Sequence, residues 1–222
     1  MGLFSDTNDP YENQLFQFDP ENWTYPDNDI HKYFELKTQL NHIVRENARM
    51  ICFSFDEAPT WLSVYGYRSS TMWAHYGDKH KGVCVVLDRN KFVKENRARI
   101  DLLGKVKYTK ELKKPEINLA SINVITEKTV QNVVRELRQV IFFSKLKDWR
   151  YENEYRVVNY KNPTVEFCSI KDSLVGIILG MRVNDNYLPT ILRLVNKNVT
   201  ISKAIFHNKY ILKECINGYI KY

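Results

Sequence analysis

The sequence lacks any hydrophobic run long enough to cross a membrane, because none of its apolar stretches approaches the roughly 18 residues that a transmembrane helix needs. It also lacks a signal peptide, since residues 1–5 hold no basic region followed by a long apolar segment. Asp6 stands where a myristoylation motif beginning at Gly2 has Ser or Thr. These absences predict a protein with no membrane partner, and we expect a cytoplasmic location.

Glycine and proline are scarce, with 8 and 7 residues among 222, whereas 44% of the residues are hydrophobic and 13% are aromatic. Scarce Gly and Pro argue against long disordered segments, and this amount of apolar material suits one compact core. No internal repeat or low-complexity segment occurs. We therefore expect residues 1–222 to form a single domain.

The sequence has no metal-binding or redox pattern of cysteines. Each of its four cysteines lies among apolar residues, none belongs to a C-x-x-C pair, and their spacing resembles no zinc site. No G-x-S-x-G nucleophile elbow, P-loop or G-x-G-x-x-G is present either. We expect no metal, and we expect buried, reduced thiols at Cys52, Cys84, Cys168 and Cys215.

The chain carries a net charge of +7 but has no dense basic block. Its basic residues form only mild clusters, at 105–114 and 203–221. At most, this charge predicts weak, salt-sensitive and non-specific binding of nucleic acid, and the alternative is an ordinary basic surface. Nothing in the sequence identifies a protein partner.

Segments with helical and with strand spacing of apolar residues follow one another without regular alternation of strand and helix. This predicts an α+β fold, with a mixed or mostly antiparallel sheet and flanking helices. Gly82–Asp88 is the most clearly buried of the predicted strands. Helices are expected near 28–47, 89–97, 121–148 (the longest) and 185–197. Strands are expected near 49–55, 82–88, 100–108, 153–160, 164–169, 174–179, 199–206 and 209–215.

The stretch from Trp149 to Arg156 combines two carboxylates, two guanidinium groups and large aromatic side chains directly before an apolar pair. In an extended strand successive side chains alternate, so Glu152, Glu154 and Arg156 are predicted to share one face. Arg156 would lower the cost of burying two acids. The functional interpretation is a catalytic or ligand-binding carboxylate at the mouth of a strand. The alternative is a solvated strand face with a Glu–Arg pair.

A second stretch places Trp73, His75 and Tyr76 within four residues, just before an apolar strand. The functional interpretation is that they line a cleft. The alternative is core packing for Trp73 and Tyr76 and a structural hydrogen bond for His75. We predict that this stretch, Met72–Tyr76, meets 149–156 in space at one site.

Such a site would combine acids, cations and aromatic rings. We expect Glu154, Glu152 and His75 to be catalytic, and Glu154 to matter more than Glu152 because it would lie deeper toward the sheet. The expected ligand-binding residues are Trp73, Tyr76, Lys145, Trp149, Arg156 and Ser54. A different arrangement, in which Asp9, Glu12, Glu152 and Glu154 bind a divalent metal, would suit a nucleic-acid hydrolase.

These motifs follow one another in an order and spacing that resembles a bacterial and phage domain family of unknown function. The resemblance spans nearly the whole chain and implies no settled activity. Members usually open with another strand and helix, so it also implies that this chain lacks those two elements. The motifs are Asn8-Asp9-Pro10-Tyr11-Glu12, Cys52-Phe53-Ser54, Met72-Trp73-Ala74-His75-Tyr76, His80-x-Gly82-Val83-Cys84 and Lys145-x-x-x-Trp149-x-x-Glu152-x-Glu154-Tyr155-Arg156.

A local resemblance points to a chemistry. Glu152–Val158 is similar to the glutamate-bearing strand of ADP-ribosyltransferases, whose toxins carry E-x-E, and Cys52-Phe53-Ser54 is similar to their hydroxyl-bearing strand. The resemblance implies an ADP-ribosyltransferase-like fold, NAD as substrate, and a carboxylate that stabilises an oxocarbenium-like state. Tyr76 or Trp73 would stack on the nicotinamide. The alternatives are a non-enzymatic module that binds a nucleotide, nucleic acid or protein, for example in phage defence, and the metal-dependent hydrolase.

Overall fold

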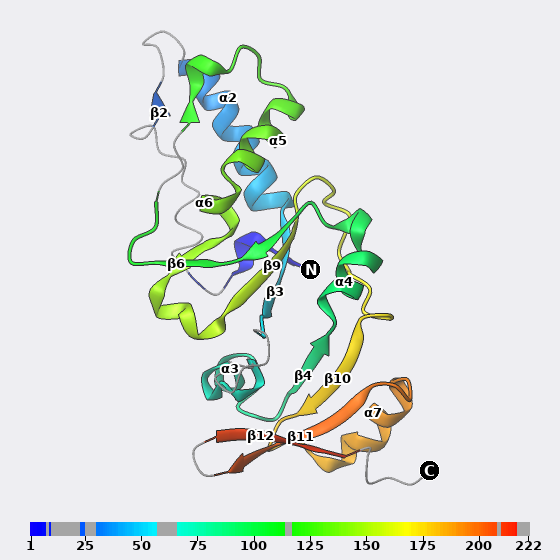
Figure 1. Ribbon diagram of the computed structural model, residues 1–222. Helices are drawn as coiled ribbons and strands as arrows, with labels where there is room; N and C mark the ends of the chain where they lie inside the picture. Colours follow the sequence, from blue (N-terminus) through cyan, green and yellow to red (C-terminus); the bar gives the residue numbers. More distant parts are fainter. Residues whose placement is uncertain are drawn as a thin grey trace. The chain divides into compact units, whose positions relative to one another are not determined.

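A computed structural model describes residues 1–7, 9, 23–24, 30–56, 66–113, 117–207 and 210–216. Its helices and mixed, mainly antiparallel sheets confirm the predicted α+β class (Figure 1). The chain divides into two compact units, each built from three segments. The first comprises Met1–Phe53, Ala98–Arg150 and Glu154–Cys168, and the second comprises Ser54–Arg97, Tyr151–Asn153 and Ser169–Tyr222. A single domain over residues 1–222, and an ADP-ribosyltransferase-like arrangement, stay predictions.

The first unit is organised around a four-stranded sheet in the order β1-β3-β9-β5. β1 (Gly2–Leu3) pairs antiparallel with β3 (Arg49–Ser54), and β5 (Leu102–Lys105) pairs antiparallel with β9 (Glu154–Asn159). All six residues of β9, an inner strand, are buried. Two short parallel pairs are the other strands of this unit within the described ranges: β2 (Trp23–Thr24) with β7 (Ile117–Asn118), and β6 (Lys107–Thr109) with β8 (Ser144–Leu146).

Helices of the first unit pack an apolar core that includes Leu36, Leu40, Val130, Val134 and Phe142. The helix expected over 121–148 is shorter and divided. It begins only after Thr126, whose hydroxyl accepts a hydrogen bond from the Thr129 amide, and the chain becomes a strand at Ser144. The described helices of this unit include η1 (Phe4–Asp6), α2 (Ile30–Asn41), which continues as the π-helix η3 (His42–Asn47), η6 (Leu119–Ser121), α5 (Glu127–Glu136) and α6 (Arg138–Phe142).

The second unit contains a four-stranded sheet in the order β12-β11-β10-β4, in which β10 and β11 are parallel and the other pairs antiparallel. Ile178 packs with Trp73 of α3, whereas its strand neighbour Leu179 packs with side chains of α7, so helices cover both faces (Figure 1). Its elements are η4 (Gly66–Arg68), α3 (Ser70–His75), β4 (Val83–Leu87), α4 (Arg89–Glu95), β10 (Leu174–Leu179), η8 (Asp185–Tyr187), α7 (Leu188–Leu194), β11 (Thr200–His207) and β12 (Tyr210–Cys215). The short η5 (Arg97–Arg99) leads back into the first unit.

Gly82–Asp88, expected to be the most clearly buried strand, is partly exposed. In the described part of the sheet β4 lies at an edge and pairs with β10 alone, and Val83 and Val85 are each 46% exposed. An apolar run predicts a strand, but it does not tell an inner strand from an edge strand. The strand expected near 164–169 is absent, since those residues are described and adopt no regular structure.

The expectation of four buried thiols is wrong for Cys52 and Cys215, which are exposed, whereas Cys84 and Cys168 are half-buried. Apolar neighbours do not predict burial here, because adjacent residues of a strand point to opposite faces. All four cysteines belong to the described residues, and none forms a disulfide. Over the same part of the chain, no helix is both long and apolar enough to span a bilayer.

Candidate functional site

A left-handed residue, Asn153, separates the two glutamates of the E-x-E stretch. Its φ is 43°, Glu152 ends the 3-10 helix η7 (Lys147–Glu152), and Glu154 opens β9. Glu152 is therefore not part of β9, and strand alternation, on which the prediction that Glu152 and Glu154 share one face was based, does not apply to it. Glu154 and Arg156, which both lie in β9, do share a face. Glu152 belongs to the second unit and Glu154 to the first.

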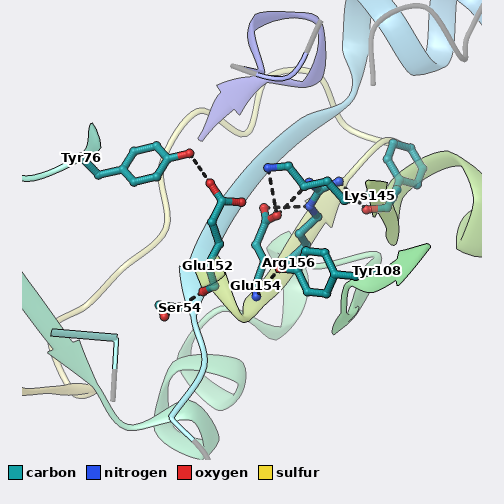
Figure 2. A network of polar contacts seen from close by, with 8 residues as sticks. Ser54, Tyr76, Tyr108, Lys145, Glu152, Glu154 and Arg156 are labelled. Carbon is teal, nitrogen blue, oxygen red and sulfur yellow. Dashed lines mark hydrogen bonds and ion pairs between the residues drawn. The ribbon is translucent and has the colours of Figure 1, made fainter. Parts of the chain in front are cut away.

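Glu154 is held by two buried cations (Figure 2). Arg156 donates from Nε to Oε1 at 2.8 Å and from Nη2 to Oε2 at 2.9 Å, and its Nη1 donates to the Phe142 carbonyl at 2.8 Å. Lys145 Nζ lies 3.5 Å from Oε2 of Glu154 and 4.6 Å from the centroid of the Trp149 ring. Glu154, Arg156 and Lys145 are only 5%, 1% and 4% exposed.

The electrostatics of this cluster keep Glu154 ionised. Burial alone would raise the pKa of Glu154, but the charge and hydrogen bonds of Arg156, the charge of Lys145 and the Cys52 thiol together hold it below its usual range. Both carboxylate oxygens accept from Arg156. This is the geometry of a structural ion pair, in which the carboxylate offsets the burial of the cations. A catalytic role for Glu154 stays a prediction, as do ligand-binding roles for Lys145, Trp149 and Arg156.

Glu152 has a different environment, within the second unit. Its Oε1 accepts a hydrogen bond of 2.5 Å from the phenol of Tyr76, 76 residues away in the sequence (Figure 2). Glu152 is 3% exposed, whereas Tyr76 is 48% exposed. The contact confirms the prediction that the stretches Met72–Tyr76 and 149–156 meet in space. It joins a buried carboxylate to a side chain that solvent and ligands can reach.

Further aromatic rings accompany this pair. The His75 and Tyr151 rings are stacked, with centroids 6.2 Å apart and planes inclined by 25°. His75 ends the short helix α3, which begins after Ser69, whose hydroxyl accepts a hydrogen bond from the Met72 amide. His75 is exposed. The imidazole of His75 and the phenol of Tyr76, the residue that follows α3, thus lie near Tyr151 and Glu152.

Three hydrogen bonds fix the backbone that carries Glu152. Ser54 Oγ donates to the Glu152 carbonyl at 2.9 Å, and the Phe55 amide donates to the Asn153 carbonyl at 2.8 Å. The Asn153 side-chain amide donates to the Phe55 carbonyl. Ser54, expected to bind a ligand, therefore supports the main chain of Glu152 with its hydroxyl. A clamped backbone of this kind limits how far the carboxylate can move.

Trp73 lies in the core of the second unit. Its indole donates from Nε1 to the Tyr67 carbonyl at 2.7 Å, and its ring stacks on His80 with centroids 5.6 Å apart. Buried against Ile178 and Ala204, Trp73 fits the core-packing alternative better than a ligand-binding role.

Two further residues take part in this site, Tyr151 and Asn153, and neither was among the predicted site residues. Asn at a strand entrance is a signal for a left-handed residue, because Asn adopts that conformation several times more often than most residues. Of the acids considered for a metal site, Asp9 is buried and Glu12 lies outside the described residues. Within the described ranges, no group of three or more His, Cys, Asp or Glu side chains is placed to hold a metal ion.

Residues 72–157 match the sequence model of a family described as "Protein of unknown function (DUF2971)". The match confirms the resemblance to a domain family of unknown function over this part of the chain. The match begins at Met72, ends at Val157, just after Arg156, and so includes both partners of the Tyr76–Glu152 hydrogen bond. No curated protein and no solved structure matches the chain. NAD, a cytoplasmic location and weak nucleic-acid binding stay predictions.

Proposed function

We propose that the chain is an ADP-ribosyltransferase-like enzyme that uses NAD, and that Glu152 is the carboxylate that contacts the ribose. The observation that carries this proposal is the buried Glu152 carboxylate held at 2.5 Å by the exposed phenol of Tyr76. A carboxylate shielded from water exerts a stronger field on a nearby positive charge than an exposed one does. Glu152 also opens the segment that resembles the glutamate-bearing strand of these enzymes.

The proposal assigns the main role to Glu152 rather than to Glu154. Both oxygens of Glu154 accept hydrogen bonds from Arg156, and its carboxylate is close to Lys145 as well. A carboxylate held by two cations has much of its charge compensated, so it stabilises a cationic transition state poorly. The Glu152 carboxylate accepts a hydrogen bond from the exposed phenol of Tyr76, so it is directed at a side chain that a ligand can reach.

In the proposed reaction, the bond between ribose C1′ and the nicotinamide nitrogen breaks, and the electron pair leaves with neutral nicotinamide. Glu152 stabilises the oxocarbenium-like C1′ and binds a ribose hydroxyl. The nucleophile, which is water or a hydroxyl or amine of an acceptor, bonds to C1′ and releases a proton that His75 accepts. With water, the products are ADP-ribose, nicotinamide and a proton. The exposed ring of Tyr76 offers a surface for stacking the cationic pyridinium of NAD.

Release of nicotinamide from NAD by the purified chain tests this function. We expect turnover by the parent protein, a loss of about 100-fold in kcat for Glu152→Gln, and a loss of about tenfold for Tyr76→Phe. Tyr187→Phe is the matched control, because Tyr187 is an exposed tyrosine of the same unit. It should leave turnover unchanged.

A second candidate function is a non-enzymatic nucleotide-binding module. The Glu154–Arg156 ion pair favours this binding module, because the pair gives one acid of the E-x-E stretch a structural role. NAD binding without nicotinamide release, measured by calorimetry, would support this module and overturn the enzyme. Neither binding nor release by the folded parent protein would overturn both.

A further inference from the structure

We propose that Asn153 is a positioning residue, whose left-handed backbone and side-chain amide hold the Glu152 carboxylate against Tyr76. The positioning role of Asn153 does not depend on the proposed function. Only the chemical role of the Glu152 carboxylate rests on it. Asn153 acts through the main chain that it shares with Glu152.

The left-handed backbone of Asn153 sets the course of the chain directly after Glu152. With φ at 43°, the chain turns between Glu152 and Glu154 and does not continue as an extended strand. Glu152, which precedes this turn, accepts a hydrogen bond from the Tyr76 phenol at 2.5 Å, and Glu154, which follows it, opens β9. A residue that disfavours positive φ would strain this turn and so displace the main chain that carries Glu152.

The side chain of Asn153 then locks this turn. Its Nδ2 donates to the Phe55 carbonyl, while the Phe55 amide donates to the Asn153 carbonyl at 2.8 Å, so the two residues bind each other reciprocally. Ser54 Oγ holds the preceding carbonyl, that of Glu152, at 2.9 Å. Only one of these three hydrogen bonds uses the Asn153 side chain. It can therefore be deleted while the other two remain.

Three substitutions separate the backbone from the amide. Asn153→Gly keeps a residue that readily adopts positive φ but removes the amide. Asn153→Ala removes the amide and also disfavours the left-handed conformation. Asn153→Asp tolerates that conformation but places an acceptor opposite the Phe55 carbonyl, where a donor is needed.

Asn159→Ala is the matched control. Asn159 is a buried asparagine at the other end of β9, and its Nδ2 donates to the Arg99 carbonyl at 3.0 Å. The loss of this amide should lower the melting temperature without affecting the Tyr76–Glu152 hydrogen bond. If the Asn153 substitutions acted only by loosening β9 in general, Asn159→Ala would weaken the Tyr76–Glu152 hydrogen bond as well.

The first measurement is the downfield proton resonance of the Tyr76–Glu152 hydrogen bond, assigned by its disappearance in Tyr76→Phe. The second is nicotinamide release. We expect Asn153→Gly and Asn153→Asp to weaken or abolish the resonance and to lower kcat by about tenfold to 100-fold, with KM little changed. Asn153→Ala should show the largest loss, and Asn159→Ala should keep both the resonance and the turnover.

An unchanged resonance and unchanged kcat in folded Asn153→Gly and Asn153→Ala would overturn the proposal. Retention in Asn153→Gly with loss in Asn153→Ala would overturn the role of the amide and support that of the left-handed backbone. A parent protein without a Tyr76-dependent resonance would overturn the hydrogen bond itself. If Asn153→Gly loses the resonance but the parent releases no nicotinamide, the positioning role is supported and the proposed enzyme fails.

Discussion

Replacing Glu154 with glutamine is expected to lower the stability of the protein strongly, because two buried cations share this carboxylate. The side-chain oxygen that remains in Glu154→Gln can still accept from Nε of Arg156, but the new amide nitrogen would then face Nη2, which is also a donor. Arg156 and Lys145, 1% and 4% exposed, would lose the negative charge of Glu154. The Nη1 bond of Arg156 to the Phe142 carbonyl would remain.

The size of the effect follows from the burial of the pair. Removing one partner of a buried ion pair costs about 3–5 kcal/mol, because the remaining charge is buried without compensation. That is a large part of the total free energy of unfolding, about 5–15 kcal/mol for a typical protein. For a chain of this length, about 2–4 °C are lost per kcal/mol, so the melting temperature should fall by about 6–20 °C.

Urea unfolding followed by circular dichroism measures this change. Glu166→Gln is the matched control, since Glu166 lies in the same unit but is exposed, and its contact with Arg49 is 3.5 Å long. It should cost less than about 1 kcal/mol. A Glu154→Gln protein that loses nicotinamide release but less than about 1 kcal/mol of stability would refute this reasoning, because Glu154 would then act in chemistry and not in structure.

Three other predictions concern pH, packing and charge. Burial alone would raise the pKa of Glu95, but hydrogen bonds from Ser173 and its neighbours lower it, and the nearby cations likewise lower the pKa of Glu154. Carboxylates with a lowered pKa stabilise the fold above the unfolded glutamate pKa of about 4.3, and this stabilisation is lost as the pH falls below that value. The free energy of unfolding should therefore decrease in acid, and it should decrease less steeply in Glu154→Gln. Gly180→Ala should cost about 1–3 kcal/mol in thermal unfolding, because a Cβ there would overlap the His80 carbonyl oxygen, whereas Gly2→Ala, with nothing within 4 Å, should cost less than about 0.5 kcal/mol. DNA binding, measured by fluorescence anisotropy, should be modest and lost at several hundred millimolar salt; persistence there would contradict a charge-only origin.

Most strands could be predicted from the sequence, because a short apolar run between polar turns constrains the backbone locally. Leu174–Leu179 forms β10, as the pattern of 174–179 predicts. The helix expected over 121–148 shows where local reasoning stops. Its apolar spacing continues past Phe142, but Ser144–Leu146 pairs with Lys107–Thr109, and that distant partner leaves no trace in the local pattern.

The site was partly predictable for a related reason. Clusters of acids, aromatic rings and histidine before apolar strands indicated which stretches meet, and the Tyr76–Glu152 hydrogen bond confirms that they do. The pattern did not predict that Glu152 and Glu154 have different hydrogen-bond partners, because strand alternation assumes an extended residue at 153. The left-handed residue Asn153 interrupts that alternation; Glu152, before it, accepts from Tyr76, and Glu154, after it, accepts from Arg156.

A crystal structure of the Glu152→Gln protein with NAD tests the central claim most directly, since the substitution keeps the side-chain shape and slows turnover. The account predicts a ribose hydroxyl within hydrogen-bond distance, about 2.7–3.2 Å, of the residue 152 side chain. It also predicts that the nicotinamide ring lies against Tyr76. NAD bound at Glu154, with its Arg156 pair broken, or no NAD bound at a concentration that saturates turnover by the parent, would contradict the account.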